Sequence, residues 1–283
     1  PASHVMLDDS IEFYAKRARG GAGCVHVGET RFDLSTCASH PAQLDLTDIR
    51  TLPQLNKFNH YAHAYGARTS VELNHSGHFA IPEFNDGKTI PISAVDRVMP
   101  NGQKVRAMTE DDMNYVADIV AKGVHMAWRG GFDMVCLHYG HGCLFGGWLS
   151  PLINTRTDGH GGSRENRIKF PRMVLERVRQ KMGNNILIEL RMSGSEMSPG
   201  GIEIEDTIYY IKELEDLADL VHISAATRFD ARTRGFMHPS CFIAHGHNAA
   251  MSEQVKKAGV KIPVGVVGGI NTPELAEEII ASG

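Results

Sequence analysis

The chain has 283 residues, of which 42% are apolar and 22% charged, and its formal net charge is −4. This composition is typical of one large α/β domain, or of two ordinary ones, whose core needs neither disulfides nor a metal, and the charge implies no nucleic acid as a partner. Because the sequence shows no run of 18 apolar residues and no signal peptide, we expect a soluble, cytoplasmic protein that does not enter a membrane.

The cysteines are odd in number and form no C-x-x-C pair, which argues against a disulfide framework and against a zinc ribbon. They are Cys24, Cys37, Cys136, Cys143 and Cys241. Cys136 lies in an apolar run, and we interpret it as a small hydrophobic residue of the core.

Helical patterns alternate with short apolar runs in the first half of the chain. We predict helices over 7–19 and 52–65, and buried strands over 24–27 and 69–73. The proline-rich segment 79–108 is predicted to leave this alternation and to form a small hairpin. Thr109 is predicted to cap a long helix that ends near residue 129.

The stretch 133–167 organises the rest of the chain. Its apolar run 134–137 is typical of a strand buried on both faces, and His138 and His141 follow at the strand's end. A loop is predicted through 145–151, and Ser163 is predicted to cap a helix over 164–182.

Further strands are predicted over 186–190, 220–223 and 263–267, and further helices over 205–217, 245–258 and 274–281. Six strands that alternate with helices predict a parallel sheet, and a (β/α)₈ TIM barrel is its natural closed form. Because six strands cannot close that barrel, we expect residues 1–283 to be a fragment of one barrel domain, without its first strand and its eighth strand–helix unit. An open doubly wound sheet is the alternative, and the absence of G-x-G-x-x-G after the early strands disfavours its dinucleotide-binding form.

Polar residues and glycines gather where the predicted strands end, which in a barrel is the face that carries chemistry. Gly268 and Gly269 precede a Thr-capped helix and would suit a phosphate, and Arg191 supplies a positive charge. His138 and His141 could hold an oxyanion or polarise a carbonyl.

Each of these features has a structural alternative. The histidine pair could bind a metal or cap loop carbonyls, and the two glycines could serve a tight turn alone. Arg191 could belong to a buried ion pair, and Glu29 could be a solvated charge at a strand end.

Three segments together resemble the Old Yellow Enzyme family, most closely its branch of 2,4-dienoyl-CoA reductase, enoate reductase and the bile-acid-inducible oxidoreductases. They are Glu72–His75, His138–His141 and the long segment 149–167, with Asn154, Arg156, Asp158, Gly161, Gly162, Glu165, Asn166 and Arg167. The resemblance covers essentially the whole chain. It implies a TIM barrel with FMN at its C-terminal face.

The resemblance also implies which residues contact FMN. Gly28 matches the small residue beside the reactive edge of the flavin, and Arg191 matches the arginine near flavin N1 and O2. Gly268 and Gly269 match part of the phosphate site. Glu72 stands where the family usually has a glutamine that faces the flavin pyrimidine, and an ionised carboxylate can only accept hydrogen bonds.

Three residues are implied in catalysis. His138 and His141 match the pair that hydrogen-bonds the activating carbonyl of the substrate. Cys143 stands where the family usually has the tyrosine that protonates the substrate. The acid is therefore Cys143, water or Tyr139, or the enzyme works as an oxidant of its substrate instead.

The resemblance thus implies an FMN-dependent ene-reductase that takes electrons from NADH or NADPH and acts on a small α,β-unsaturated carbonyl compound. The alternatives are an amine dehydrogenase or demethylase of the same fold, a flavin-free barrel for a sugar phosphate, and a non-catalytic flavoprotein. Longer members add a 4Fe-4S cluster and an FAD domain after the barrel. The chain could also assemble as a homo-oligomer.

Overall fold

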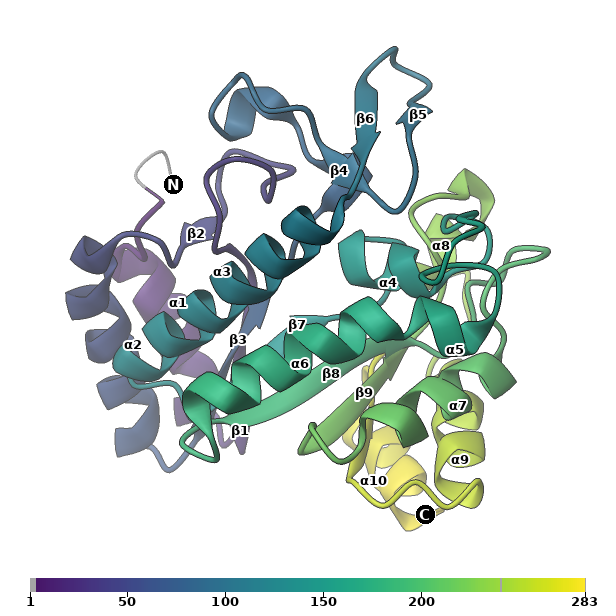
Figure 1. Ribbon diagram of the computed structural model, residues 1–283. Coiled ribbons are helices and arrows are strands. Elements are labelled where there is room, and N and C mark those ends of the chain that lie inside the picture. Colours follow the sequence, from purple (N-terminus) through teal and green to yellow (C-terminus); the bar gives the residue numbers. More distant parts are fainter. Residues whose placement is uncertain (1–3, 240, 283) are drawn as a thin grey trace. The chain divides into compact units, whose positions relative to one another are not determined.

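The computed structural model describes residues 4–239 and 241–282. They form two compact units: unit 1 comprises the described residues up to Leu137 together with Met173–Ile188, and unit 2 comprises His138–Arg172 and the described residues from Glu189 onward. Strands and helices alternate along the chain in both units, as Figure 1 shows.

Unit 1 contains parallel strands in the order β2-β1-β3-β7. The strands are β1 (Cys24–Arg31), β2 (Leu44–Asp45), β3 (Arg68–Leu73) and β7 (Met134–His138), whose last residue belongs to unit 2. The helices are α1 (Asp8–Arg19), α2 (Leu52–Ala64), α3 (Glu110–Arg129) and α6 (Lys169–Met182), which begins in unit 2. Short 3₁₀ turns lie at Ile49–Thr51, Gly77–Phe79 and Pro82–Phe84.

The predicted hairpin within 79–108 is confirmed. It consists of β5 (Arg97–Val98) and β6 (Lys104–Ala107), which pair antiparallel, and β4 (Ile92–Ser93) pairs with β6 on its other side.

Unit 2 contains parallel strands in the order β10-β9-β8. They are β8 (Leu187–Ser193, whose first two residues belong to unit 1), β9 (Leu220–Ser224) and β10 (Val264–Val266). The helices are α4 (Leu144–Leu149), α5 (Arg164–Arg167), α7 (Ile204–Leu214), α8 (Arg234–Met237), α9 (Ala249–Lys257) and α10 (Pro273–Ala281), with a 3₁₀ turn at Ala231–Thr233.

Helix α3 shows how the sequence builds the core of unit 1. Thr109 and Asp112 form a full capping box at its start, as expected for a threonine before three acidic residues. Gly123 faces the sheet, where a Cβ would come within 2.7 Å of the Cβ of Phe32 and 3.1 Å of Leu73. The glycine therefore lets the helix approach the sheet more closely than any larger residue would allow.

All six predicted strands are present, and β2 is a seventh that the sequence reasoning missed because two residues give no periodic signal. The parallel α/β class is confirmed. Several element boundaries were wrong. The loop predicted over 145–151 contains most of α4 (Leu144–Leu149). The helix predicted over 164–182 is broken at Ile168, and the helix predicted from residue 245 begins at Ala249.

Local chemistry explains the late start of α9. Gly246 has φ +68°, which is not helical, and the side chain of Asn248 donates to the carbonyl of Val267, 2.5 Å away. The chain is therefore held next to the end of β10 before the helix begins. The predicted helix over 205–217 likewise stops earlier, at Leu214.

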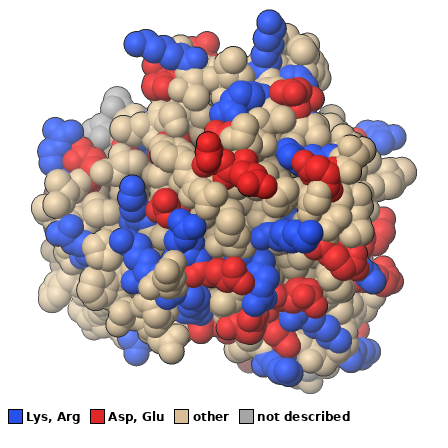
Figure 2. All heavy atoms as spheres, viewed as in Figure 1, with Lys and Arg blue, Asp and Glu red and all other residues tan. Residues whose placement is uncertain are grey.

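The surface and the cysteines agree with the composition. Acidic and basic side chains are interspersed over the face in Figure 2, without a broad area of one sign. None of the five cysteines, all of which are described, forms a disulfide. Among the described residues, no helix combines the length and apolarity that crossing a bilayer would require.

Candidate functional site

The histidine pair lies at the end of β7, in unit 2, and both side chains are buried. His141 Nδ1 is 3.1 Å from His138 Nε2, and His141 Nε2 is 2.8 Å from Ser224 Oγ at the end of β9. The two rings and the hydroxyl therefore form one hydrogen-bonded chain. The structure brings the two predicted histidines together and adds Ser224 to them.

The loop that carries His141 is held in an unusual backbone conformation. His141 has φ +56°, a region that costs a non-glycine residue energy, and its N–H donates to Ser193 Oγ at 3.0 Å. Ser193 in turn donates to the carbonyl of Ala226. The adjacent Gly142 has φ +72°, and a Cβ there would lie 2.5 Å from Thr227 Oγ1. This conformation and close packing fix the ring of His141 in place.

The chain of hydrogen bonds links the tautomers of the two rings. If Ser224 donates to His141 Nε2, then His141 Nδ1–H donates to His138 Nε2, and the proton of His138 lies on Nδ1. In the opposite arrangement His138 Nε2–H donates to His141 Nδ1, and His141 Nε2–H donates to Ser224 Oγ. Only the first setting gives His138 an Nδ1–H that could be donated to a substrate oxygen. Because both nitrogens of His141 are engaged, this ring orients His138.

Arg191 was predicted to follow its strand, but it lies inside β8, opposite His222 on β9. Two residues further along, Ser193 lies opposite Ser224. Side chains two apart on a strand share one face, so Arg191 is on the same face as the two serines that hold His141. The sequence analysis ended this strand three residues too early, at residue 190 instead of Ser193.

Gly268 and Gly269 follow β10 in unit 2, where the backbone requires glycine. Their φ values are +139° and +63°, and a Cβ on Gly268 would lie 2.5 Å from Asn248 Nδ2 and 3.1 Å from His247 Cε1. The two ring nitrogens of His247 are buried and have no hydrogen-bond partner among the described residues. A histidine with unused nitrogens beside two glycines is a suitable place for an anion.

Cys143 is buried and stands just before the first residue of α4. Its N–H donates to the carbonyl of Gly140, and its carbonyl accepts from the N–H of Gly147. The backbone on both sides of the thiol is thus fixed, two residues after His141.

The long segment 149–167 is a scaffold in this structure. Asn154 donates to the carbonyls of Trp148 and His160, and Arg167 donates to the carbonyl of Leu149 and the hydroxyl of Tyr210. A Cβ on Gly161 would lie 2.2 Å from the carbonyl oxygen of Arg156. These side chains bind neighbouring backbone, and the segment therefore holds its own shape.

A buried carboxylate helps to fix the start of that segment. Glu196 Oε2 accepts from the hydroxyl of Ser150 at 2.6 Å and from the N–H of Ile202 at 3.0 Å. Burial raises the pKa of Glu196, and the two hydrogen bonds oppose that rise. The carboxylate joins α4 to the loop after β8, both within unit 2.

Gly28 and Glu72 lie in unit 1. Gly28 is inside β1 and lines a cavity of about 390 Å³, and a Cβ on it would meet no atom within 4 Å. Glu72 is buried on β3, with its Oε2 3.7 Å from Nε2 of His26 on β1. The sequence analysis did not single out His26. Its proximity to Glu72 follows from the pairing of β1 with β3, in which His26 lies opposite Ser70, two residues before Glu72. The sequence around each strand gives no local signal of this pairing.

Glu29 is more than a solvated charge. Its Oε1 accepts from Gln43 Nε2 at 2.6 Å and from Asn74 Nδ2 at 2.8 Å, so the carboxylate ties the segment before β2 to the end of β3. Glu29 was predicted to follow its strand, but it lies inside β1, and its carboxylate has a structural role there.

Comparison with known proteins identifies the family. The family model described as NADH:flavin oxidoreductase / NADH oxidase matches residues 2–283. An NADH oxidase of Thermoanaerobacter brockii is 32% identical over 283 aligned positions, which cover 96% of this chain and 42% of that protein. An NADPH dehydrogenase of Listeria welshimeri is 27% identical over 98% of this chain and 78% of its own length. The chain thus spans less than half of the first of these relatives.

Solved structures agree on the fold. A 2-naphthoyl-CoA reductase in complex with 2-naphthoyl-CoA superposes with a TM-score of 0.90, at 24% identity, over 100% of this chain and 44% of that one. An Old Yellow Enzyme homologue from Zymomonas mobilis gives 0.81 at 21% identity, over 100% and 78%. The predicted barrel class is confirmed by this likeness, and the chain belongs to the NADH:flavin oxidoreductase / NADH oxidase family.

Proposed function

We propose that this chain is the FMN-binding part of an NAD(P)H-dependent reductase that acts on the C=C bond of α,β-unsaturated carbonyl compounds. The observation that supports it best is the chain of hydrogen bonds from Ser224 through His141 to His138. It is buried, rigid and able to present one N–H to an oxygen. A carbonyl that gains negative charge during reduction is the group such a donor stabilises.

A second observation, independent of the histidine pair, supports FMN as the cofactor. Gly268 and Gly269 form a turn that a Cβ would obstruct, and beside it His247 has two buried nitrogens with no partner among the described residues. These groups would hold the phosphate of FMN. In unit 1, the open space beside Gly28 would accept the edge of a flat ring. Glu72 and Arg191 remain proposed contacts of the flavin ring.

The bound flavin would supply the hydride chemistry, and the protein's part is to position and polarise. His138 would donate Nδ1–H to the substrate carbonyl, while His141 and Ser224 keep its proton on that nitrogen. Arg191, on the same face of β8 as Ser193, would place a positive charge where negative charge accumulates. An iron–sulfur cluster and an FAD domain are proposed only for segments outside this chain.

Cys143 is proposed as the acid that protonates the α-carbon. General acid catalysis typically contributes about 10²–10⁴ in rate, so Cys143→Ala should slow substrate reduction by that order and leave flavin reduction by NAD(P)H unchanged. Cys241→Ala, at an exposed cysteine, is the matched control. A wild-type rate in Cys143→Ala would remove the thiol from the mechanism and assign the proton to water or Tyr139.

Dehydrogenation of a C–N substrate is the second candidate, and the cysteine in place of the family's usual tyrosine favours it. The two functions separate in anaerobic stopped-flow experiments on the purified protein. The proposed reductase is reduced by NAD(P)H and reoxidised by an enone, whereas the dehydrogenase is reduced by an amine. A protein that binds no flavin, judged from its absorption spectrum, would contradict both.

A further inference from the structure

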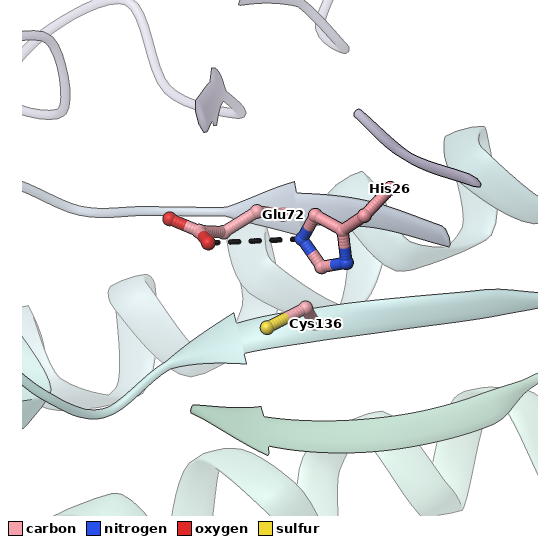
Figure 3. Close-up of side chains that lie close together, drawn as sticks. All are labelled: His26, Glu72 and Cys136. Carbon is pink, nitrogen blue, oxygen red and sulfur yellow. Dashed lines mark ion pairs between the residues drawn. The ribbon is translucent and has the colours of Figure 1, made fainter. Parts of the chain in front are cut away.

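Three potential metal ligands from different strands meet in unit 1. Figure 3 shows His26, Glu72 and Cys136 side by side, each on a different strand. Their ligand atoms, one from each residue, all lie within 4.8 Å of one another. His26 Nε2 and Glu72 Oε2 are 3.7 Å apart.

The pairing of the three strands explains why these side chains lie close together. Glu72 on β3 lies opposite Cys136 on β7, and Ser70, two residues before Glu72, lies opposite His26 on β1. Side chains alternate along a strand, so Ser70 and Glu72 share a face, and their partners share it too. Three adjacent strands thus offer a nitrogen, an oxygen and a sulfur to one point, on backbone that hydrogen bonds hold rigid.

Burial separates this cluster from an ordinary surface group. Cys136 is fully buried and Glu72 is 5% exposed, whereas 31% of the His26 side chain is exposed. The ring nitrogen that faces Glu72, His26 Nε2, is itself buried.

Ser70 provides an independent observation. Its side chain is fully buried, and its hydroxyl has no hydrogen-bond partner among the described residues. By strand alternation it lies on the same face as the three ligands. A buried hydroxyl without a partner calls for an explanation, and a water on a bound metal ion would give it one.

We propose that His26, Glu72 and Cys136 bind a zinc ion, with a water as the fourth ligand and Ser70 as a hydrogen-bond partner of that water. Zinc accepts imidazole, carboxylate and thiolate together in a tetrahedron, in which neighbouring ligand atoms lie roughly 3.3–3.8 Å apart. His26 Nε2 and Glu72 Oε2 already have this separation at 3.7 Å, and Cys136 Sγ, within 4.8 Å of both, would have to approach them by up to about 1.3 Å. Cys136 would bind as the thiolate and release its proton. The site goes beyond the proposed function and uses protein atoms of unit 1 alone. It takes one carboxylate oxygen of Glu72, Oε2, and leaves Oε1 for the flavin contact proposed above.

X-ray absorption at the zinc edge tests the site without interference from a flavin. The purified full chain, loaded with zinc and dialysed, should retain stoichiometric zinc with one sulfur neighbour at about 2.3 Å. In Cys136→Ser the sulfur neighbour should disappear. Cys37→Ser, a buried cysteine of the same unit outside the cluster, should keep it.

His26→Gln gives a second measurement at a partly exposed position, should Cys136→Ser fail to fold. Loss of a ligand should weaken zinc binding at least about 100-fold, since even the outer partners of metal ligands contribute 10–100-fold. A wild-type protein that retains no zinc, a sulfur neighbour that persists in Cys136→Ser, or unchanged affinity in His26→Gln would overturn the proposal. His26 and Glu72 would then be an ion pair beside a hydrophobic cysteine.

Discussion

Two buried histidines that follow strands of this molecule differ in what holds them. His75 follows β3 in unit 1: its Nδ1 accepts from the N–H of Gly77 at 3.1 Å, and its Nε2 is 3.1 Å from Thr36 Oγ1. His141 follows β7 in unit 2, and its two nitrogens face the side chains of His138 and Ser224. Both rings lie just past a strand's end, where the sequence alone does not separate them.

The difference lies in where the proton can be. A backbone N–H can only donate, so Nδ1 of His75 must accept and its proton stays on Nε2. A hydroxyl and a second imidazole can donate or accept, so the proton of His141 can change sides. Burial lowers the pKa of His75 to about 4, although the charge of Asp33 opposes that shift. His75 is therefore a neutral structural residue, and His141 belongs to a chain that can move a proton.

We expect the largest effect from removing the imidazole of His138, which ends this chain of hydrogen bonds. In the flavin-loaded enzyme, His138→Ala should slow reoxidation by an enone by about 10²–10³, the usual cost of losing one oxyanion donor. Reduction of the flavin by NAD(P)H should hardly change. Stopped-flow kinetics of the two half-reactions measure this. Equal losses in both would mean that His138, like His75, is structural.

The second prediction concerns pH and His75. In the unfolded chain a histidine binds a proton below about pH 6.5, but folded His75 does so only below about 4. Unfolding therefore takes up a proton between these values, and stability falls as the pH drops through this window. The loss is roughly 3 kcal/mol in total.

Denaturant unfolding of the wild type and of His75→Gln at several pH values isolates this term, because the carboxylates titrate in both proteins. The difference in unfolding free energy between the two should shrink as the pH falls from 6.5 to 4. A constant difference would show that His75 is protonated in the folded protein.

A smaller effect is expected from Ser224→Ala. The variant removes the group that fixes the tautomer of His141, and a hydrogen bond of this kind contributes about 1 kcal/mol, or about fivefold in rate. The loss should appear in enone reduction and should change its pH profile. Ser195→Ala, which removes a hydroxyl elsewhere in unit 2, serves as the control. An unchanged pH profile would exclude Ser224 from proton positioning.

Thr36→Val in unit 1 is expected to affect stability and not the rate of enone reduction. The variant leaves Nε2 of His75 without its hydrogen-bond partner. A buried unsatisfied donor costs about 1–3 kcal/mol of stability, and the cost is toward the lower end if the ring can shift. Chemical denaturation measures the change. An effect on the enone half-reaction that exceeds the effect on stability would contradict a structural His75.

The strands and the histidine pair were predictable because their signals are local. Each apolar run from 24–27 to 263–267 marks a strand, and His138 and His141 are three residues apart on one loop. Helix α4 was missed because six buried residues with two adjacent glycines show no amphipathic period. The proximity of His26 and Glu72, and the proton path through Ser224, depend on the register of separate strands, which one sequence does not encode locally.

The segment 149–167 offers a use in protein engineering. Its backbone is fixed by Asn154, Gly161 and Arg167, whereas Thr155 and Thr157 between them are exposed. A segment whose shape does not depend on its outward side chains can accept new ones there without refolding. Library diversity at those two threonines would therefore vary the surface of unit 2 over a constant backbone.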